Sequence, residues 1–316
     1  MKTKQTNTIR PRLPIATLTL AAAALLAAPA SGRADTIYVS NDGDTTISKF
    51  TSSGRSVFAT GLNVPHGLAL DSAGNLYVSN YGDNTIMKFT PGGAGSLFAN
   101  AGLTSPEGMA FDRAGNLYVA NIGSYDYGIQ NNHSYIEKFT PSGVSSFFAD
   151  ATGSDVFGLA CDSAGNVYAS YNNYHKIMKF TPGGVGSVFA STGLNFPEGL
   201  AFDAAGNLYA ANPASRNIER FSPSGADLGV FASSGLSNPA GLAFDGAGNL
   251  YAANFNIDGY IEKFTPNGVG SVFATGLTYP VFIAIIPEPS TWALLGLGLV
   301  VLFVTRGQKE KAVLET

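Results

Sequence analysis

The chain has 316 residues, enough for one or two domains, and only 13% of them are Asp, Glu, Lys or Arg. Its 38 glycines depart from the composition of an ordinary cytosolic enzyme and predict many tight turns. Its formal net charge is −4, and the segment 35–286 alone has 10 Lys and Arg against 19 Asp and Glu, a balance of −9. This acidic balance argues against nucleic acid as a partner.

The first 34 residues have the pattern of a secretory signal peptide. Four basic residues precede and open an apolar run from 13 to 28, and small-residue cleavage sites follow at Ala30 and Ala34. An N-terminal membrane anchor is the alternative, but the run is shorter than the ~20 residues that a spanning helix needs. We expect cleavage after Ala34, with Ala30 as the alternative site, and export of the remaining chain.

A repeat of roughly 40 residues follows this leader. The phrase Gly-Leu-Ala-Leu-Asp-Ser-Ala-Gly-Asn-Leu-Tyr-Val-Ser-Asn ends at Asn80 and recurs in related form four more times. The gaps between its aspartates are 41, 50, 41 and 42 residues. Each unit contains only strand-like pieces and turn signals, which is typical of four-stranded propeller blades rather than of a helical solenoid.

Alternation and turn chemistry place the strands of one unit. The first two are the Gly-Leu-Ala-Leu and Leu-Tyr-Val pieces, joined by Asp-x-Ala-Gly-Asn, where Asp folds back on the backbone and Gly or Asn takes a positive φ. The third strand is Ile-x-Lys-Phe, whose Phe we expect between blades while Lys reaches solvent along its apolar stem. The fourth strand ends in Phe-Ala. The third-strand phenylalanines are Phe50, Phe89, Phe139, Phe180, Phe221 and Phe264.

The count of strands predicts how the ring closes. Six third strands and six fourth strands stand against only five complete first-to-second hairpins. The mismatch disappears if N-terminal strands at 37–41, 47–50 and 57–59 join a C-terminal strand at 282–286 in one composite blade. Such closure removes open sheet edges. The sequence therefore predicts an all-β, six-bladed β-propeller of four-stranded blades over residues 35–286.

The single cysteine, Cys161, has no internal disulfide partner, so packing alone must stabilise the exported domain. It takes the place of Leu70 or Phe111 in the repeat. We therefore expect a buried apolar role rather than a reactive thiol.

The pattern Pro-x-Gly-Leu-Ala-x-Asp-x-x-Gly-Asn-Leu-Tyr-Val begins at Pro65 and recurs in related form from Pro106, Pro197 and Pro239. It resembles the NHL-repeat propellers and, more loosely, the streptogramin lyase and gluconolactonase propellers. The resemblance spans residues 36–286 and implies the fold. It does not imply one function, because these families include enzymes, binding modules and scaffolds.

The residue before each Gly-Leu-Ala should lie where an innermost strand begins, at the mouth of the central channel. In gluconolactonase-like propellers this position supplies carboxylate and amide ligands of a divalent cation, and in streptogramin lyases nearby His and Glu serve catalysis. The resemblance makes His66, Glu107 and Glu198 candidate ligands of Ca²⁺, Mg²⁺ or Zn²⁺ and candidate catalytic residues. The six residues at this position are His66, Glu107, Phe157, Glu198, Ala240 and Val281.

Three of these six residues are apolar and therefore wrong for a ring of metal ligands. Two glutamates at a solvated channel mouth also need no metal to be stable. A channel mouth without any cofactor is thus the leading interpretation, and the cation site is the alternative.

One loop breaks the regularity of the repeat. The span 121–139 is nine residues longer than the matching span 80–89 and contains Tyr125, Tyr127 and His133. Tyrosine rings on a rigid scaffold can stack on a sugar ring, so these residues form a candidate ligand-binding loop. A tolerated surface insertion is equally consistent with the sequence.

The C-terminal 30 residues, 287–316, read as a second targeting segment. Pro287, Glu288 and Pro289 are followed by an apolar stretch near 292–305 and a basic cluster. This order resembles the PEP-CTERM sorting signal, which implies that an exosortase, an integral-membrane cysteine protease, recognises the three residues. The stretch is expected to form a short transmembrane helix, with a buried helix or a disordered tail as alternatives.

Two functions remain open at this point. The leading hypothesis is a non-catalytic binding or structural protein of the cell surface or exopolysaccharide matrix, with polysaccharide or envelope proteins as partners. The rival is a cation-dependent lactonase or lyase at the channel mouth. Elsewhere the sequence shows no arrangement of Ser, Cys or His typical of nucleophilic catalysis. The expected location is the cell envelope, the cell surface or the medium after C-terminal processing.

Overall fold

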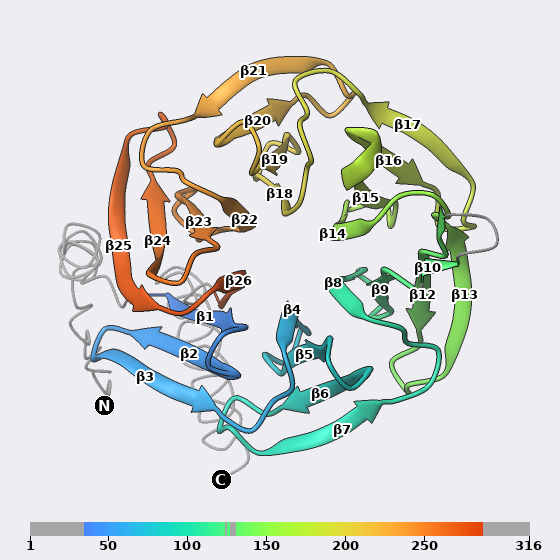
Figure 1. Cartoon of the computed structure of the whole chain (residues 1–316), viewed down its shortest axis with the longest axis horizontal. Helices are drawn as coiled ribbons and strands as arrows, with labels where there is room; N and C mark the ends of the chain where they lie inside the picture. The colour runs from blue at the N-terminus through green and yellow to red at the C-terminus, as the bar shows by residue number, and fades with distance from the viewer. Residues whose placement is uncertain (1–34, 124, 127–130, 287–316) are drawn as a thin grey trace, which may run out of the picture. The chain divides into compact units, whose positions relative to one another are not determined.

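The computed structural model describes residues 35–123, 125–126 and 131–286, which form a ring of six four-stranded antiparallel sheets around a central channel (Figure 1). Blade 1 combines the two ends of the described chain in the order β26-β1-β2-β3. Its strands are β1 Thr36–Asn41, β2 Thr46–Thr51, β3 Gly54–Ala59 and β26 Pro280–Ile286.

The other blades follow the chain from the channel outward, with the first strand innermost (Figure 1). Blade 2 consists of β4 Pro65–Leu70, β5 Leu76–Asn80, β6 Thr85–Phe89 and β7 Gly95–Ala99. Blade 3 consists of β8 Pro106–Phe111, β9 Leu117–Asn121, β12 Tyr135–Phe139 and β13 Ser145–Asp150. Blade 4 consists of β14 Val156–Cys161, β15 Val167–Tyr171, β16 Lys176–Phe180 and β17 Gly186–Ala190, with a short 3₁₀ helix at Asn172–Tyr174. Blade 5 consists of β18 Leu200–Phe202, β19 Leu208–Asn212, β20 Asn217–Phe221 and β21 Asp227–Ala232. Blade 6 consists of β22 Pro239–Phe244, β23 Leu250–Asn254, β24 Gly259–Phe264 and β25 Gly270–Leu277.

The predicted six-bladed propeller and its composite blade are therefore confirmed. Within blade 1, Thr36 pairs with Ile286 at one end of the sheet and Asn41 pairs with Pro280 at the other. The first and last described residues thus lie side by side at the end of the channel to which Ile286 points. The ring closes by strand pairing between the chain's two ends, without any disulfide among the described residues.

The two targeting segments fall outside this description. The expected signal peptide, with its cleavage at Ala30 or Ala34, and the expected transmembrane helix near 292–305 both lie in residues that the structure does not describe. Within residues 35–123, 125–126 and 131–286, no helix is long and apolar enough to cross a bilayer.

The Asp-x-Ala-Gly-Asn turns form as the sequence predicts. In blade 2, Asp71 Oδ1 accepts hydrogen bonds from the backbone N–H groups of Ala73 and Asn75, both at 2.9 Å, and Oδ2 accepts one from Asn75 Nδ2 at 2.7 Å. Gly74 takes the positive φ of 79° that lets the turn close. The aspartate is therefore a turn-forming residue, and the same Asp–Asn pair recurs in blades 3 to 6.

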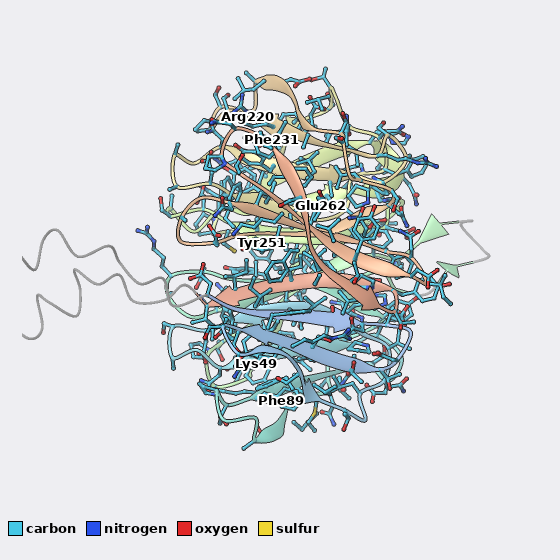
Figure 2. The ribbon with its side chains drawn as sticks, turned by 90° about the vertical axis from the view of Figure 1, so that its left-hand side faces the viewer. Lys49, Phe89, Arg220, Phe231, Tyr251 and Glu262 are labelled. Carbon is cyan, nitrogen blue, oxygen red and sulfur yellow. The ribbon has the colours of Figure 1, made fainter. Side chains whose placement is uncertain are left out.

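Six apolar clusters fill the spaces between neighbouring blades, one for each contact around the ring. Each of the six third-strand phenylalanines is buried in a different cluster, as expected from alternation. Figure 2 labels Phe231 and Tyr251 among the side chains that occupy these spaces. The core is thus divided into six equivalent layers rather than gathered in one centre.

The third-strand lysines reach solvent less than the sequence suggests. Lys88 Nζ lies 5.1 Å from the centre of the Tyr77 ring and 3.6 Å from an Asp71 carboxylate oxygen. Lys179 and Lys263 repeat this arrangement in blades 4 and 6. The stem of the lysine covers the blade, as predicted, but its ammonium group ends over the second-strand tyrosine and against the turn aspartate.

Close backbone contact holds the innermost strands together. A Cβ atom built on the second-strand-facing glycine of each innermost strand would lie under 3.0 Å from the carbonyl oxygen of the channel residue in the next blade. For example, Gly67 faces Glu107 and Gly108 faces Phe157. Only glycine fits here, and the reason is space rather than φ. The glycines are Gly67, Gly108, Gly158, Gly199 and Gly241.

We predict that Gly108→Ala lowers the free energy of unfolding by about 1–3 kcal/mol, because the new methyl group pushes β8 away from β14. Gly92→Ala is the matched control, since its nearest neighbour would lie at an ordinary 3.8 Å. Urea denaturation of the two variants measures the difference. Equal stability of Gly108→Ala and the wild type would contradict the assigned contact.

Candidate functional site

A pit of about 80 Å³ opens at one end of the channel. All six residues that the repeat places at the start of the innermost strands line it, together with two phenylalanines from blades 6 and 1. The lining residues are His66, Glu107, Phe157, Glu198, Ala240, Phe255, Val281 and Phe282. The pit therefore gathers one side chain from each blade.

A local irregularity of the innermost strands precedes the regular pairing and places these residues. In blade 2, Pro65 pairs with Asn80 and Leu68 with Val78, with a register shift between them that leaves His66 and Gly67 out of the ladder. Blades 3, 4 and 6 show the same shift at the same place. Bulges of this kind re-aim side chains, so the repeat itself directs one residue per blade into the channel.

His66 is the centre of a charged network in the pit. Its Nδ1 lies 2.8 Å from Glu107 Oε2, and its Nε2 lies 3.8 Å from an Asp42 carboxylate oxygen. The imidazole stacks on the Tyr81 ring with centroids 5.0 Å apart and planes at 27°. Ser40 Oγ donates a hydrogen bond to the His66 carbonyl at 2.6 Å, which ties the network to blade 1.

The geometry makes His66 and Glu107 an internal ion pair. Burial disfavours the charged imidazole, but the charge of Glu107 and hydrogen bonds with Asp42 and Glu107 raise the pKa of His66 to about 10. The protonated Nδ1–H then donates to Glu107, which is only 2% exposed. Since His66 is already protonated and held by two carboxylates, it does not act as a free general base at neutral pH.

Glu198 differs from Glu107 because it has no cationic partner in contact. Burial, together with the negative charge of Glu107, raises the pKa of Glu198 to about 8. Its carboxyl group is therefore mostly neutral at pH 7 and can donate a hydrogen bond to a ligand. The pit thus combines a neutral carboxyl group and a charge-paired carboxylate with apolar walls.

The donor set does not fit the hard divalent cation considered from sequence. Such ions take six or more oxygen ligands for Ca²⁺ and near-octahedral oxygen for Mg²⁺. Here Glu107 is held by His66, and Phe157, Ala240 and Val281 occupy the other positions of the ring. No group of three or more His, Cys, Asp or Glu with metal-binding geometry occurs among the described residues.

One sequence-based expectation about the glutamates is wrong. We expected both to stand at a solvated channel mouth, but Glu107 is buried and its carboxylate depends on His66 for charge compensation. The cause is the close approach of the innermost strands, which narrows the channel around the bulged residues.

Sequence reasoning missed three contributors to the site. Asp42 follows the composite-blade strand β1, Tyr81 follows β5, and Phe255 follows β23. Each occupies the position directly after the strand-end asparagine of its blade, at 41, 80 or 254. That shared position is the signal that could have predicted them, since these loops lie at the same end of the blades as the channel residues.

The long loop of blade 3 lies at the same end of its blade as the pit. Asn121, from which it departs, pairs with Pro106 beside Glu107. Tyr125 begins the two-residue strand β10, which pairs with β11, Tyr125–Asp126 with Asn131–Asn132; this hairpin stands out from the blades (Figure 2). His133 is exposed, and Tyr127 lies outside the described residues.

Cys161 is partly exposed and packs against the apolar cluster between blades 3 and 4. Burial, with smaller contributions from Asp112 and Asp162, raises the pKa of its thiol to about 12. The protonated thiol is unreactive, in agreement with the apolar role expected from the repeat.

Two family models match segments of the chain. The PEP-CTERM protein-sorting motif matches residues 286–309, and the NHL repeat matches residues 62–89. The chain is a six-bladed β-propeller that carries an NHL repeat and a PEP-CTERM sorting signal. The sorting signal directs this propeller to export and to the cell envelope or surface, and it implies recognition by an exosortase.

Solved structures with the same fold share little sequence with this NHL-repeat propeller. A chain of a nidogen/laminin complex is 21% identical with a TM-score of 0.67, covering 80% of this chain and 98% of the other. A gluconolactonase from Xanthomonas campestris is 20% identical with a TM-score of 0.60, covering 69% and 79%. A streptogramin B lyase is 14% identical with a TM-score of 0.58, covering 78% and 91%. These likenesses show the fold alone.

A search of curated proteins finds no match to the chain. The function must therefore be argued from the pit and from the sorting signal.

We predict that the Glu198 carboxyl titrates near pH 8 rather than near its ordinary value of 4.5. Its raised pKa means that the folded state holds a proton that the unfolded state loses, so this group makes stability fall as pH rises from about 4.5 to 8. Glu198→Gln should match the wild type at pH 4 and exceed its stability increasingly up to pH 8.

Chemical denaturation across this pH range measures the effect, and the titration of carboxyl carbons by NMR locates the midpoint. Glu137→Gln, a buried glutamate of β12 outside the pit, controls for the general effect of removing a carboxyl group. A constant difference between Glu198→Gln and the wild type at all pH values would show that Glu198 titrates normally.

Proposed function

We propose that this exported propeller is a non-catalytic binding protein of the cell surface or exopolysaccharide matrix, and that its pit holds part of a saccharide ligand. The observation that carries the proposal is the composition of the pit. A neutral carboxyl group at Glu198 and a paired carboxylate at Glu107 face apolar walls, with no hydroxyl, thiol or amine nucleophile among the lining side chains.

Sugars present hydroxyl groups at the edges of rings whose faces are apolar. Glu198 can donate to a hydroxyl oxygen and Glu107 can accept from a hydroxyl group, while Phe157, Phe255 and Phe282 supply apolar contact. Because His66 is already paired, binding a neutral ligand requires no new buried charge. These features favour an uncharged polar ligand over an ion.

The sorting signal supports the location in this proposal. The chain leaves β26 at Ile286, at the end of the propeller opposite to Val281 and the pit. The attachment point of the C-terminal signal therefore does not cover the pit.

A cation-dependent lactonase or lyase is the second candidate function. The similarity of fold to a gluconolactonase and a streptogramin B lyase supports it, as does the meeting of His66, Glu107 and Glu198 in one pit. The protonated, doubly held His66 and the apolar half of the ring weigh against it. We therefore place it behind the binding function.

The test is binding of the soluble propeller, residues 35–286, to exopolysaccharide isolated from the producing cells. We expect retention on the immobilised polymer, and we expect Glu198→Gln to weaken it by about tenfold through loss of the donated hydrogen bond. Glu137→Gln should bind like the wild type because Glu137 lies outside the pit. Affinity electrophoresis or surface plasmon resonance gives the dissociation constants.

Failure of the wild-type propeller to bind any saccharide fraction of these cells would refute the proposal. Equal binding by wild type and Glu198→Gln would leave the ligand elsewhere on the propeller and would remove the pit from the account.

A separate prediction concerns sorting. Glu288→Ala should block processing, because the exosortase would no longer meet the Pro-Glu-Pro motif, and the unprocessed chain should accumulate in the membrane fraction. An epitope tag at the C-terminus reports processing by its loss on a blot. Glu310→Ala, outside the matched segment 286–309, is the control. Normal release of the Glu288→Ala protein would show that the motif is not read.

A further inference from the structure

The circumference of the propeller carries most of its exposed large apolar side chains. The outermost strands and the turns that lead into them hold these residues, whereas only Tyr174, Phe196 and Ile257 lie in other loops. The residues on the circumference are Val57, Leu97, Val144, Phe147, Val185, Val188, Leu228, Val230, Val269, Val272 and Phe273. This distribution is a property of the outer wall and is independent of the pit.

Charge divides the six outermost strands into two alternating sets. The strands β3, β13 and β21 of blades 1, 3 and 5 contain Arg55, Asp150 and Asp227. The strands β7, β17 and β25 of blades 2, 4 and 6 contain no charged residue and share the pattern Gly-Ser-Val/Leu-Phe-Ala. The uncharged strands therefore occupy every second position around the ring (Figure 1).

Each outermost strand has a neighbour on one side only among the described strands. Its other edge presents backbone N–H and C=O groups, which pair readily with another strand unless a charge or a proline prevents it. β7, β17 and β25 contain neither. We refer to these three strands as the open edges.

The open edges differ from the protected ones in charge rather than in apolar exposure. Leu97, Val188 and Val272 at their centres are 54%, 57% and 59% exposed, and Val57 and Val230 on the charged strands are 58% and 55% exposed. The regular part of each open edge is short, since the pairing shifts register after its third residue, as at Leu97 in β7. A short edge fits weak and reversible association.

We propose that the propeller associates with further copies of itself through the open edges, with up to three neighbours for each molecule. The occupant is a second copy because the same short segment recurs at all three edges and is self-complementary. When two such strands pair antiparallel about a two-fold axis, the central Val or Leu of one strand faces that of the other, and no like charges oppose each other.

The charges elsewhere give this association a distinctive salt dependence. The segment 35–286 has a formal charge of −9, so two copies repel each other at low ionic strength. Contacts made by backbone and apolar groups are not weakened by salt in this way. Association through the open edges should therefore strengthen as salt is added, whereas association through ion pairs should weaken.

The test is sedimentation velocity of the soluble propeller, residues 35–286, whose ring closes within this segment. We expect a concentration-dependent shift from monomer to larger species that increases between low and high NaCl. The triple variant Leu97→Lys, Val188→Lys, Val272→Lys should raise the apparent dissociation constant by at least about tenfold, because like charges would face each other across the edge.

The double variant Val57→Lys, Val230→Lys is the matched control, with equal exposure but on strands that are already charged. It should associate like the wild type, and thermal melting confirms that all variants fold. A wild-type propeller that stays monomeric at every concentration and salt level would overturn the proposal. Equal loss of association in the triple and double variants would overturn the assignment to the open edges.

Discussion

The contact between an innermost glycine and the carbonyl group of the next blade sets the dimensions of the whole site. Because no side chain separates neighbouring innermost strands at Gly67, Gly108, Gly158, Gly199 and Gly241, the blades meet backbone to backbone around the channel. The bulge that contains each glycine turns the preceding side chain inward. One repeated structural feature therefore both packs the ring and creates a position where sequence is free to vary between blades.

Variation at that position gives the pit its chemistry. A carboxylate as buried as Glu107 needs compensation, and the adjacent blade supplies it through His66, which in turn lies near Asp42 of the composite blade. Glu198, without such a partner, holds its proton instead. The two glutamates have the same repeat position but opposite protonation at neutral pH, and this difference distinguishes the pit from a ring of metal-binding carboxylates.

The periodic part of the sequence predicts the fold closely, and the non-periodic contacts limit the prediction of the site. The repeated Asp-x-Ala-Gly-Asn turn and the third-strand phenylalanines fix blade number, closure and core, since both depend on local alternation and turn geometry. The position of His66 and Glu107 at the channel follows from the same repeat. Their mutual pairing does not, because it depends on the distance between blades, and neither does the role of Tyr81, whose ring covers His66 from a loop.

The central claim is that the pit is occupied by its own internal ion pair and serves binding rather than cation-dependent catalysis. Titration calorimetry of the soluble propeller with Ca²⁺, Mg²⁺ and Zn²⁺, beside the double variant Glu107→Ala, Glu198→Ala, tests it most directly. The account predicts no saturable binding of any of the three ions to either protein. Tight binding to the wild type that is lost in the double variant would contradict the account and would place the lactonase or lyase function first.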